Sequence, residues 1–175
     1  KPLTDDERCV TDPVRSRERT MNRAVKLLAA KPRSIGELRT RLLEKRWTNE
    51  EIVDAVIEKL REYKYVDDEQ FAADLALSKL RQKPQGKRKL KFDLSRKQLA
   101  PETLAAAVDA AFEKMPEHEL LQKAIEKRVR LKGIPETRED KKKFFDHLLR
   151  QGFDMGLVRE RLDAILKLSE TDATE

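Results

Sequence analysis

Residues 38–60 read LRTRLLEKRWTNEEIVDAVIEKL, and this stretch decides how the chain folds. Its apolar residues fall on two helical stripes with a bulky residue between them: Leu38, Leu42, Trp47, Ile52, Val56 and Leu60. A spacing of about four residues places successive side chains on one face of a helix. The stretch therefore predicts two amphipathic helices joined by a short turn at Trp47.

The same apolar pattern recurs twice further along the chain. Moved 52 positions (38 to 90), it falls on Leu90, Leu94, Leu99, Leu104, Val108 and Phe112. Moved a further 54 (90 to 144), it falls on Phe144, Leu148, Phe153, Val158, Leu162 and Leu166. Self-similarity at such a period indicates a tandem repeat, and we expect all these residues to pack in cores.

Another helix-length segment precedes each pair of helices, at residues 19–30, 68–82 and 117–131. We therefore expect an all-α fold of three tandem three-helix repeats that form an elongated, curved array. The predicted boundaries are a flexible tail at 1–17, repeats at 18–66, 67–115 and 116–168, and a second flexible tail at 169–175.

Helix-start signals support these positions. Capping boxes are predicted at Ser34 with Glu37 and at Thr48 with Glu51, because a Ser or Thr followed three residues later by Glu satisfies the free backbone N–H groups of a helix start. The other signals are Pro101 at a first helical position, Asp154 as an N-cap, and Gly86 and Thr137 near the starts of two middle helices.

Composition agrees with a helical, intracellular protein. Charged residues make up 41% of the chain and aromatic residues 5%, which favours amphipathic helices over a β-sandwich or barrel. Cys9 is the only cysteine, so no intramolecular disulfide can form and a reducing cytoplasm is expected. No apolar run is long enough for a membrane span, and no signal-peptide pattern is present.

The sequence contains no recognisable catalytic constellation. His118 and His147 stand alone, Cys9 has no base nearby in sequence, and there is no glycine-rich phosphate loop. The adjacent carboxylates Asp67 and Asp68 are better explained as a helix N-cap than as a metal site. We therefore expect a protein that acts by binding, with no enzymatic activity, cofactor or metal.

Basic residues cluster around the starts of the middle helices. Lys141, Lys142 and Lys143 align with Lys87, Arg88 and Lys89 of the previous repeat. With a net charge of +6 and a pI near 9.4, such positions could form a stripe that meets phosphate or an acidic surface, or could simply solvate the helices. The candidate contact residues are Arg33, Arg39, Arg41, Lys87, Arg88, Lys91, Lys141 and Lys142.

A three-helix unit also suggests a helix-turn-helix, whose last helix would read bases in the major groove. In the first repeat this helix carries Glu50, Glu51, Asp54 and Glu58, whereas base readout favours Arg, Asn and Gln. Sequence-specific duplex recognition is therefore disfavoured, while contact with the nucleic-acid backbone through the middle helices stays open.

Four short motifs, in this order, resemble the RecX family, which regulates the bacterial recombinase RecA. They are residues 33–38 (RSIGEL) followed by Arg41-Leu42, Val66-Asp67-Asp68 followed by Phe71-Ala72, Gly86 followed by Leu90 and Leu94, and Gly152-Phe153. The resemblance covers about residues 20–168. The chain departs from the family at Arg46, Lys64 and Gln98, where members often have glycine at a helix end, so these turns need another cap or a left-handed residue.

The resemblance implies a modular helical chain that lies in the groove of the RecA filament on single-stranded DNA. It also implies inhibition of RecA ATP hydrolysis, strand exchange and coprotease activity, and hence roles in DNA repair, recombination and the SOS response. The alternatives are a stand-alone, non-specific DNA-binding repeat protein and an inert helical scaffold. We expect a monomer, because no further apolar face is evident in the pattern.

Overall fold

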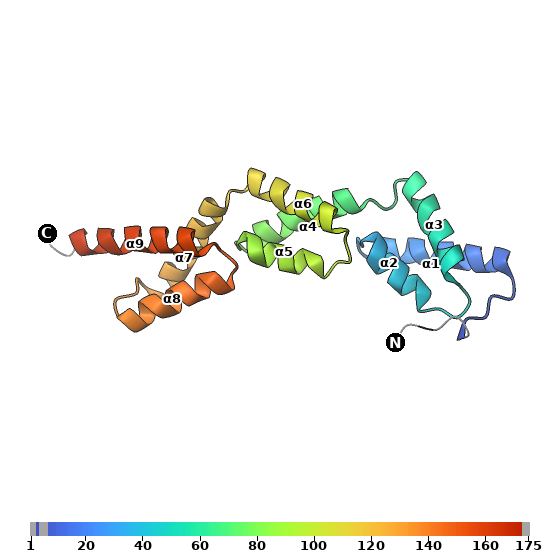
Figure 1. Cartoon of the computed structure of the whole chain (residues 1–175), viewed down its shortest axis with the longest axis horizontal. Coiled ribbons are helices and arrows are strands. Elements are labelled where there is room, and N and C mark those ends of the chain that lie inside the picture. Colours follow the sequence, from blue (N-terminus) through green and yellow to red (C-terminus); the bar gives the residue numbers. More distant parts are fainter. Residues whose placement is uncertain (1–2, 4–6, 173–175) are drawn as a thin grey trace. The chain divides into compact units, whose positions relative to one another are not determined.

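The protein is described by a computed structural model that covers residue 3 and residues 7–172, with side chains described as far as residue 165. These residues form nine α-helices and no strand (Figure 1). The helices are α1 (Pro13–Ala30), α2 (Ile35–Leu43), α3 (Glu50–Glu62), α4 (Asp68–Gln82), α5 (Lys87–Ser95), α6 (Pro101–Lys114), α7 (Glu117–Lys132), α8 (Arg138–Arg150) and α9 (Met155–Asp172). The predicted all-α fold of three successive three-helix repeats is confirmed.

The chain divides into two compact units, and the middle repeat contributes to both. Unit 1 comprises residues 1–74 and 94–104, and unit 2 comprises residues 75–93 and 105–175. The division passes through α4, α5 and α6, so no repeat boundary coincides with a unit boundary.

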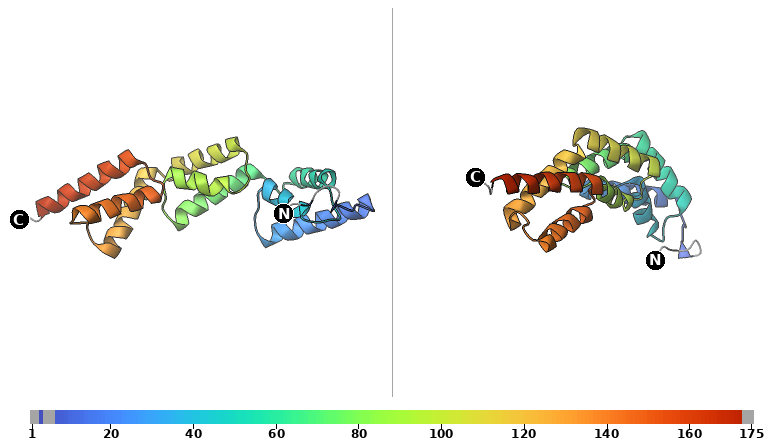
Figure 2. Two further views of the ribbon diagram at one scale, coloured as in Figure 1. Left: turned by 60° about the horizontal axis from the view of Figure 1, so that its bottom comes forward. Right: turned by 60° about the vertical axis from the view of Figure 1, so that its left-hand side comes forward.

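In unit 1, α1, α2 and α3 lie side by side around one apolar core (Figures 1 and 2). The buried members of this core are Ala24, Leu38, Leu42, Val53, Val56, Ile57, Leu60 and Val66. Burial of these apolar stripes is the main source of stability for helices that are individually short.

In unit 2, α7, α8 and α9 pack together, and the remaining parts of the middle repeat join them (Figure 2). The largest fully buried side chains here are those of Leu80, Leu90, Leu120, Leu121, Ile125, Leu148 and Phe153. Ion pairs connect the helices of the middle repeat within this unit. Lys79 of α4 lies 3.1 Å from Asp93 of α5, and Lys87 of α5 lies 2.6 Å from Asp109 of α6.

The aligned apolar pattern predicts the cores well. Trp47, Leu99 and Phe112 are partly buried, and the side chain of Leu166 lies outside the described residues. All other members of the three aligned series are buried. The repeated apolar pattern therefore predicts correctly which of these side chains are buried.

Most helix-start predictions are confirmed, and one is wrong. Ser34 and Glu37 form the predicted capping box, Pro101 is the first residue of α6, and Asp154 accepts a hydrogen bond from the Leu157 N–H at 3.0 Å. Thr137 caps α8 and accepts from the Asp140 N–H at 3.1 Å.

Thr48 does not cap α3. The N-cap is Asn49, whose side chain accepts from the Ile52 N–H at 3.0 Å. Thr48 is buried instead, and its hydroxyl lies 3.0 Å from that of Thr20, a buried residue of α1. The tertiary partner on α1 outweighs the local capping pattern, and this partner is invisible in the local sequence.

Replacing Asn49 with alanine is expected to lower the free energy of unfolding by about 1 kcal/mol, because one N–H of α3 loses its acceptor. Urea denaturation followed by circular dichroism measures the change. Asn49→Asp serves as the control, since aspartate caps equally well and should leave stability nearly unchanged. Equal losses in both variants would argue against the capping role.

Two helix ends differ from the expected positions. α1 begins at Pro13 with Asp12 as its N-cap, so the helix reaches into the stretch predicted as a tail, and Ser16 within it is buried. α9 continues to Asp172, beyond the predicted end at residue 168. Residues 1, 2, 4–6 and 173–175 of the predicted tails lie outside the described residues.

A contact between helix start and turn recurs in both units. In unit 1, the Ser34 hydroxyl donates a hydrogen bond to the carbonyl oxygen of Lys97, and Lys97 Nζ lies 3.0 Å from Glu37. The start of α2 is further tied to α4, because the Ile35 N–H donates to the Asp68 carboxylate at 2.8 Å. The start of α2 therefore contacts the turn that precedes α6.

Unit 2 contains the equivalent contact one repeat later. The Gly86 N–H donates to the Gln151 carbonyl at 3.0 Å, and the Arg88 N–H donates to the Gly152 carbonyl at 3.3 Å. Gly86 is the aligned counterpart of Ser34 (34 + 52), and Gln151 is that of Lys97 (97 + 54). The sequence repeat is therefore also a repeat of the contact that joins one repeat to the next.

Two of the three non-glycine turns adopt the left-handed backbone, which was one of the two alternatives predicted for them. Lys64 has φ 57° and Gln98 has φ 53°, conformations that cost a non-glycine residue about 1 kcal/mol. Arg46 does not have a positive φ. Its carbonyl oxygen accepts a hydrogen bond from the Cys9 N–H at 2.8 Å, so the segment before α1 covers this turn.

Candidate contact residues and a basic cleft

The three candidate arginines of unit 1 are all engaged within the fold. Arg39 of α2 lies 2.8 Å from Asp54 and 3.3 Å from Glu50, both on α3. The hydrogen bond to Asp54 raises the pKa of Arg39, although burial opposes this effect. Because two carboxylates already balance its charge, Arg39 is a weak candidate for binding an anionic partner.

Arg33 and Arg41 have different internal partners. The Arg33 Nε–H donates to the Leu27 carbonyl at 3.3 Å, near the end of α1. Arg41 lies 2.8 Å from Glu44 three residues later, an exposed pair that contributes little to stability. Arg41 is therefore the most accessible of the three arginines.

In unit 2, two of the three candidates on α5 form contacts within the fold, and the third is free to contact a partner. Lys87 is paired with Asp109, and an Arg88 guanidinium N–H donates to the Leu149 carbonyl at 3.1 Å, which strengthens the contact with the end of α8. Lys91 is exposed, and no ion pair engages it within the described part of the chain. Lys91 is the α5 candidate that is best placed to meet a partner.

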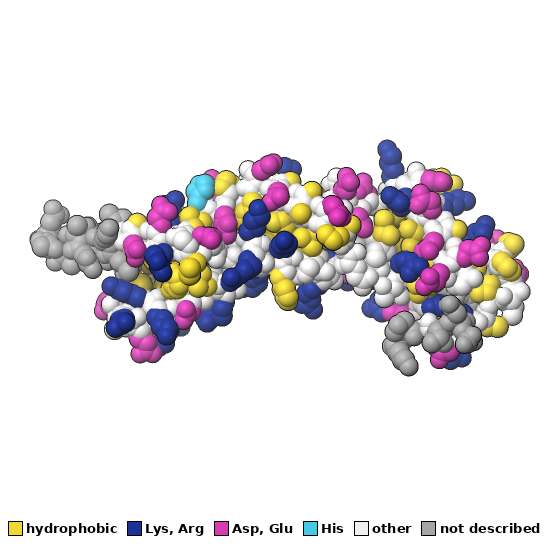
Figure 3. Space-filling model, in the orientation of Figure 1, with side chains coloured by type: hydrophobic (Ala, Val, Ile, Leu, Met, Phe, Trp, Pro, Cys, Tyr) yellow, Lys and Arg dark blue, Asp and Glu magenta, His cyan; other side chains and the backbone are white. Residues whose placement is uncertain are grey.

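Lys141 and Lys142 lie on the first turns of α8. Together with Phe145, Arg159, Leu162 and Asp163 they line a shallow depression between α8 and α9. Lys142 is exposed and Lys141 is partly buried, whereas the neighbouring Lys143 is paired with Glu139 at 2.7 Å. Figure 3 shows several Lys and Arg side chains over the part of unit 2 that contains α8, with Asp and Glu side chains among them.

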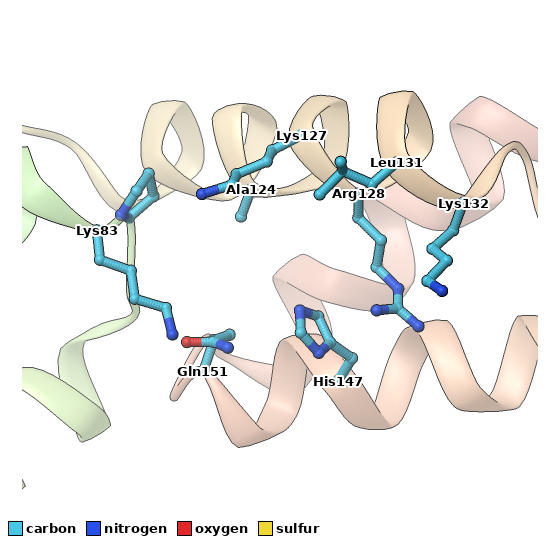
Figure 4. A pocket seen from close by; sticks show the side chains of 9 residues that line it. Lys83, Ala124, Lys127, Arg128, Leu131, Lys132, His147 and Gln151 are labelled. Atoms are coloured by element: carbon cyan, nitrogen blue, oxygen red, sulfur yellow. The ribbon is translucent and has the colours of Figure 1, made fainter.

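A more concentrated basic site lies elsewhere in unit 2, in a cleft between α7, α8 and the segment after α4. Its volume is about 250 Å³. It is lined by Lys83, Pro84, Ala124, Lys127, Arg128, Leu131, Lys132, His147 and Gln151 (Figure 4). We call it the α7/α8 cleft. No carboxylate lines it.

The positive charge around this cleft affects His147. Burial lowers the pKa of His147, and the cations of Arg128, Arg150, Lys83 and Lys89 lower it further. A neutral imidazole next to several cations marks a place where the local potential is positive.

Sequence reasoning missed this cleft. Lys83 was not among the candidate contact residues, and His147 was considered only as an isolated histidine. Lys127, Arg128 and Lys132 occur at helical spacing on α7, which was the available signal. Their meeting with His147 and Gln151 depends on the packing of α7 against α8, which local periodicity does not specify.

Asp67 acts as the predicted helix N-cap, whereas Asp68 contacts another helix. Asp67 accepts from the Glu69 and Gln70 N–H groups at 2.9 and 3.0 Å, and Asp68 accepts from Ile35. Burial raises the pKa of Asp68, while the hydrogen bond from Ile35 opposes the shift. Within the described residues, no group of three or more His, Cys, Asp or Glu side chains could hold a metal ion.

Comparison with known proteins identifies the family. Models of the first, second and third three-helix domains of RecX match residues 21–60, 67–108 and 116–162. The chain belongs to the RecX family. Each match falls inside one of the repeats predicted from the sequence.

Relatives from this family span most of the chain. The regulatory protein RecX of Chlorobium limicola is 37% identical over 145 residues, which are 82% of this chain and 87% of that protein. The RecX of Prosthecochloris aestuarii is 32% identical over 152 residues, 85% of this chain and 94% of that protein. The chain therefore has the domain content of a RecX regulatory protein across the matched region.

Solved RecX structures have the same fold. The crystal structure of RecX from Lactobacillus salivarius has a TM-score of 0.76 and 19% identity, and the match covers 89% of this chain and 99% of that one. A second RecX crystal structure has a TM-score of 0.70 and 21% identity over 84% of this chain and 71% of that one. None of the described helices has the length and apolar character needed to cross a bilayer.

Proposed function

We propose that this RecX-family chain binds RecA filaments on single-stranded DNA and reduces RecA ATP hydrolysis, strand exchange and coprotease activity. The observation that supports the proposal most directly is the ordered match of all three RecX domains along the chain. In this proposal the chain is a non-enzymatic regulator that acts in the cytoplasm, as a monomer, in DNA repair, recombination and SOS control.

The available cations supply a testable contact surface for this function. Lys91 and Lys142 are exposed and have no ion pair among the described residues, unlike Arg39 and Lys87. Arg88 is a poor choice for mutation, because its loss would also disturb the contact with Leu149. We therefore propose Lys91 and Lys142 as the first positions to examine for contact with RecA or DNA phosphate.

The test is single-stranded-DNA-dependent ATP hydrolysis by RecA with increasing amounts of this protein. The parent is expected to inhibit, and the Lys91→Glu/Lys142→Glu variant is expected to need about tenfold more protein for half inhibition, a change of roughly 1.4 kcal/mol. A matched control is Lys26→Glu/Lys123→Glu, which makes the same charge change at two exposed lysines outside the candidate set and should inhibit like the parent.

The possible results separate three conclusions. Equal inhibition by the parent and both variants would keep the RecA function and place the contact elsewhere. No inhibition by the parent would contradict the proposal. Absence of inhibition together with tight, salt-sensitive DNA binding would favour the stand-alone DNA-binding alternative.

A further inference from the structure

The α7/α8 cleft contains an unusual concentration of hydrogen-bond donors. Lys83, Lys127, Arg128 and Lys132 approach it from two segments of unit 2, and His147 lies on its α8 side (Figure 4). None of these four cations forms an ion pair with a carboxylate in the described part of the chain. Lys79, Lys87 and Lys143 elsewhere in unit 2 are paired, whereas Lys91 and Lys142 are not paired among the described residues, so the cleft is distinguished by the gathering of four such cations and not by the lack of ion pairs alone.

Two polar atoms at this cleft are buried and lack partners within the described residues: Arg128 Nε, a donor that a phosphate oxygen would satisfy, and Gln151 Oε1, an acceptor that needs a donor such as the hydroxyl of a protonated phosphate. Buried polar groups in folded proteins nearly always have a hydrogen-bond partner, so an unpartnered atom needs an explanation. The Arg128 guanidinium lies 5.2 Å from the centre of the Phe144 ring, and this contact holds its position. The cleft thus contains a positioned guanidinium whose hydrogen-bonding capacity is not fully used.

We propose that the α7/α8 cleft is a binding site for a phosphate group. The ammonium and guanidinium groups are donors only, and the side-chain acceptors of the lining are the Gln151 carboxamide oxygen and one ring nitrogen of neutral His147. A phosphate offers several acceptor oxygens and one or two negative charges, and it matches such a lining. A peptide carries a backbone N–H at nearly every residue, and most of these would find no acceptor here. The phosphate could come from a nucleic-acid strand or from a free phosphate compound.

His147 couples this site to pH. The charged groups that affect its pKa most are Arg128 of α7, Arg150 of α8, and Lys83 and Lys89, and all four are cationic. A bound phosphate would offset this positive potential and favour the imidazolium form, so binding raises the pKa of His147. By reciprocity, phosphate binds more tightly as the pH falls through the His147 titration range.

The two histidines of the chain allow phosphate binding at the cleft to be measured directly on the full chain. The imidazole resonances of His147 and His118 are titrated with pH by NMR, in a buffer without phosphate and at low salt. Addition of pyrophosphate or of an oligothymidylate is expected to raise the pKa of His147 by on the order of one unit. His118 is exposed and lies outside the cleft, so it serves as the internal reference and should shift much less.

The added compounds distinguish the source of the phosphate. A response to pyrophosphate shows that a free phosphate compound is sufficient, whereas a response to the oligonucleotide alone assigns the cleft to a phosphodiester backbone. No change in the His147 pKa with either compound would overturn the proposal. An equal shift with polyglutamate would also overturn it, because the site would then respond to any polyanion.

Matched variants test the cleft itself. Lys127→Glu/Lys132→Glu reverses two exposed cations that line the cleft, and the response of His147 should be lost. Lys123→Glu changes an exposed lysine on the same helix outside the cleft, and it should keep the response. Retention of the shift in the double variant would contradict the assignment. Circular dichroism and the His118 resonance check that both variants are folded. RecA is absent from this experiment, so its failure would leave the proposed function untouched.

Discussion

Replacing Gly86 with alanine is expected to lower the free energy of unfolding of unit 2 by about 3 kcal/mol. A Cβ at Gly86 would lie 2.2 Å from the carbonyl carbon and oxygen of Gly152 and from the backbone nitrogen of Phe153. These are backbone atoms and cannot rotate away as a flexible side chain could. The start of α5 would therefore move off the turn before α9, and the hydrogen bond from Gly86 to Gln151 would weaken.

The control is Gly156→Ala, in the first turn of α9 in the same unit. Gly156 has no positive φ, and the nearest atom to an added Cβ is the end of the flexible Asp154 side chain at 3.2 Å, so stability should change by less than about 1 kcal/mol. Urea denaturation followed by circular dichroism compares the two variants. If Gly86→Ala costs no more than Gly156→Ala, the close approach of α5 to the turn is not needed for stability.

Replacing Leu38 with alanine is expected to lower the free energy of unfolding of unit 1 by about 3 kcal/mol. Leu38 is fully buried among Ala24, Leu42, Val53 and their neighbours in the unit 1 core. Truncation removes the transfer free energy of the lost methyl groups and leaves a cavity that closely packed neighbours fill only in part. The repeat pattern places Leu38 at the first position of its series, so this variant also tests the residue from which the alignment starts.

Trp47 is the only tryptophan of the chain and lies in unit 1, so its fluorescence reports on this unit during denaturation. The control is Val14→Ala, because Val14 is 72% exposed and its truncation should change stability by no more than about 0.5 kcal/mol. A small effect of Leu38→Ala on the fluorescence transition would mean that the core around α2 repacks without a cavity.

The sequence predicts those features that depend on burial at a regular spacing. Leu38, Leu90 and Phe144 are aligned by the repeat, and all three are buried. The left-handed backbone was one of two alternatives at Lys64 and Gln98, and both residues adopt it. Burial at a regular spacing follows from the chemistry of one helix, which is why the sequence is enough to predict it, whereas the choice between the two turn alternatives required the structure.

Features that depend on a distant partner were missed or remained open. Thr48 has a good capping sequence, but its hydroxyl meets Thr20 and Asn49 takes the cap. Arg39 and Arg88 look like free cations in the sequence, yet one pairs with Asp54 and the other binds the Leu149 carbonyl. In each case the partner comes from another helix, and helical periodicity does not specify which helix that is.

The same kind of contact between a helix start and a turn occurs at Ser34 and at Gly86. This recurrence bears on how such a chain could lengthen in evolution. A duplicated repeat that is inserted between two existing ones meets a matching turn on one side and a matching helix start on the other, so it needs no new interface. A copy added before the first repeat would need a backbone acceptor that is already in use. The Arg46 carbonyl, which is the counterpart of the Gly152 carbonyl in the later contact, is already occupied by the Cys9 N–H. Growth by internal duplication is therefore the route that the contacts favour.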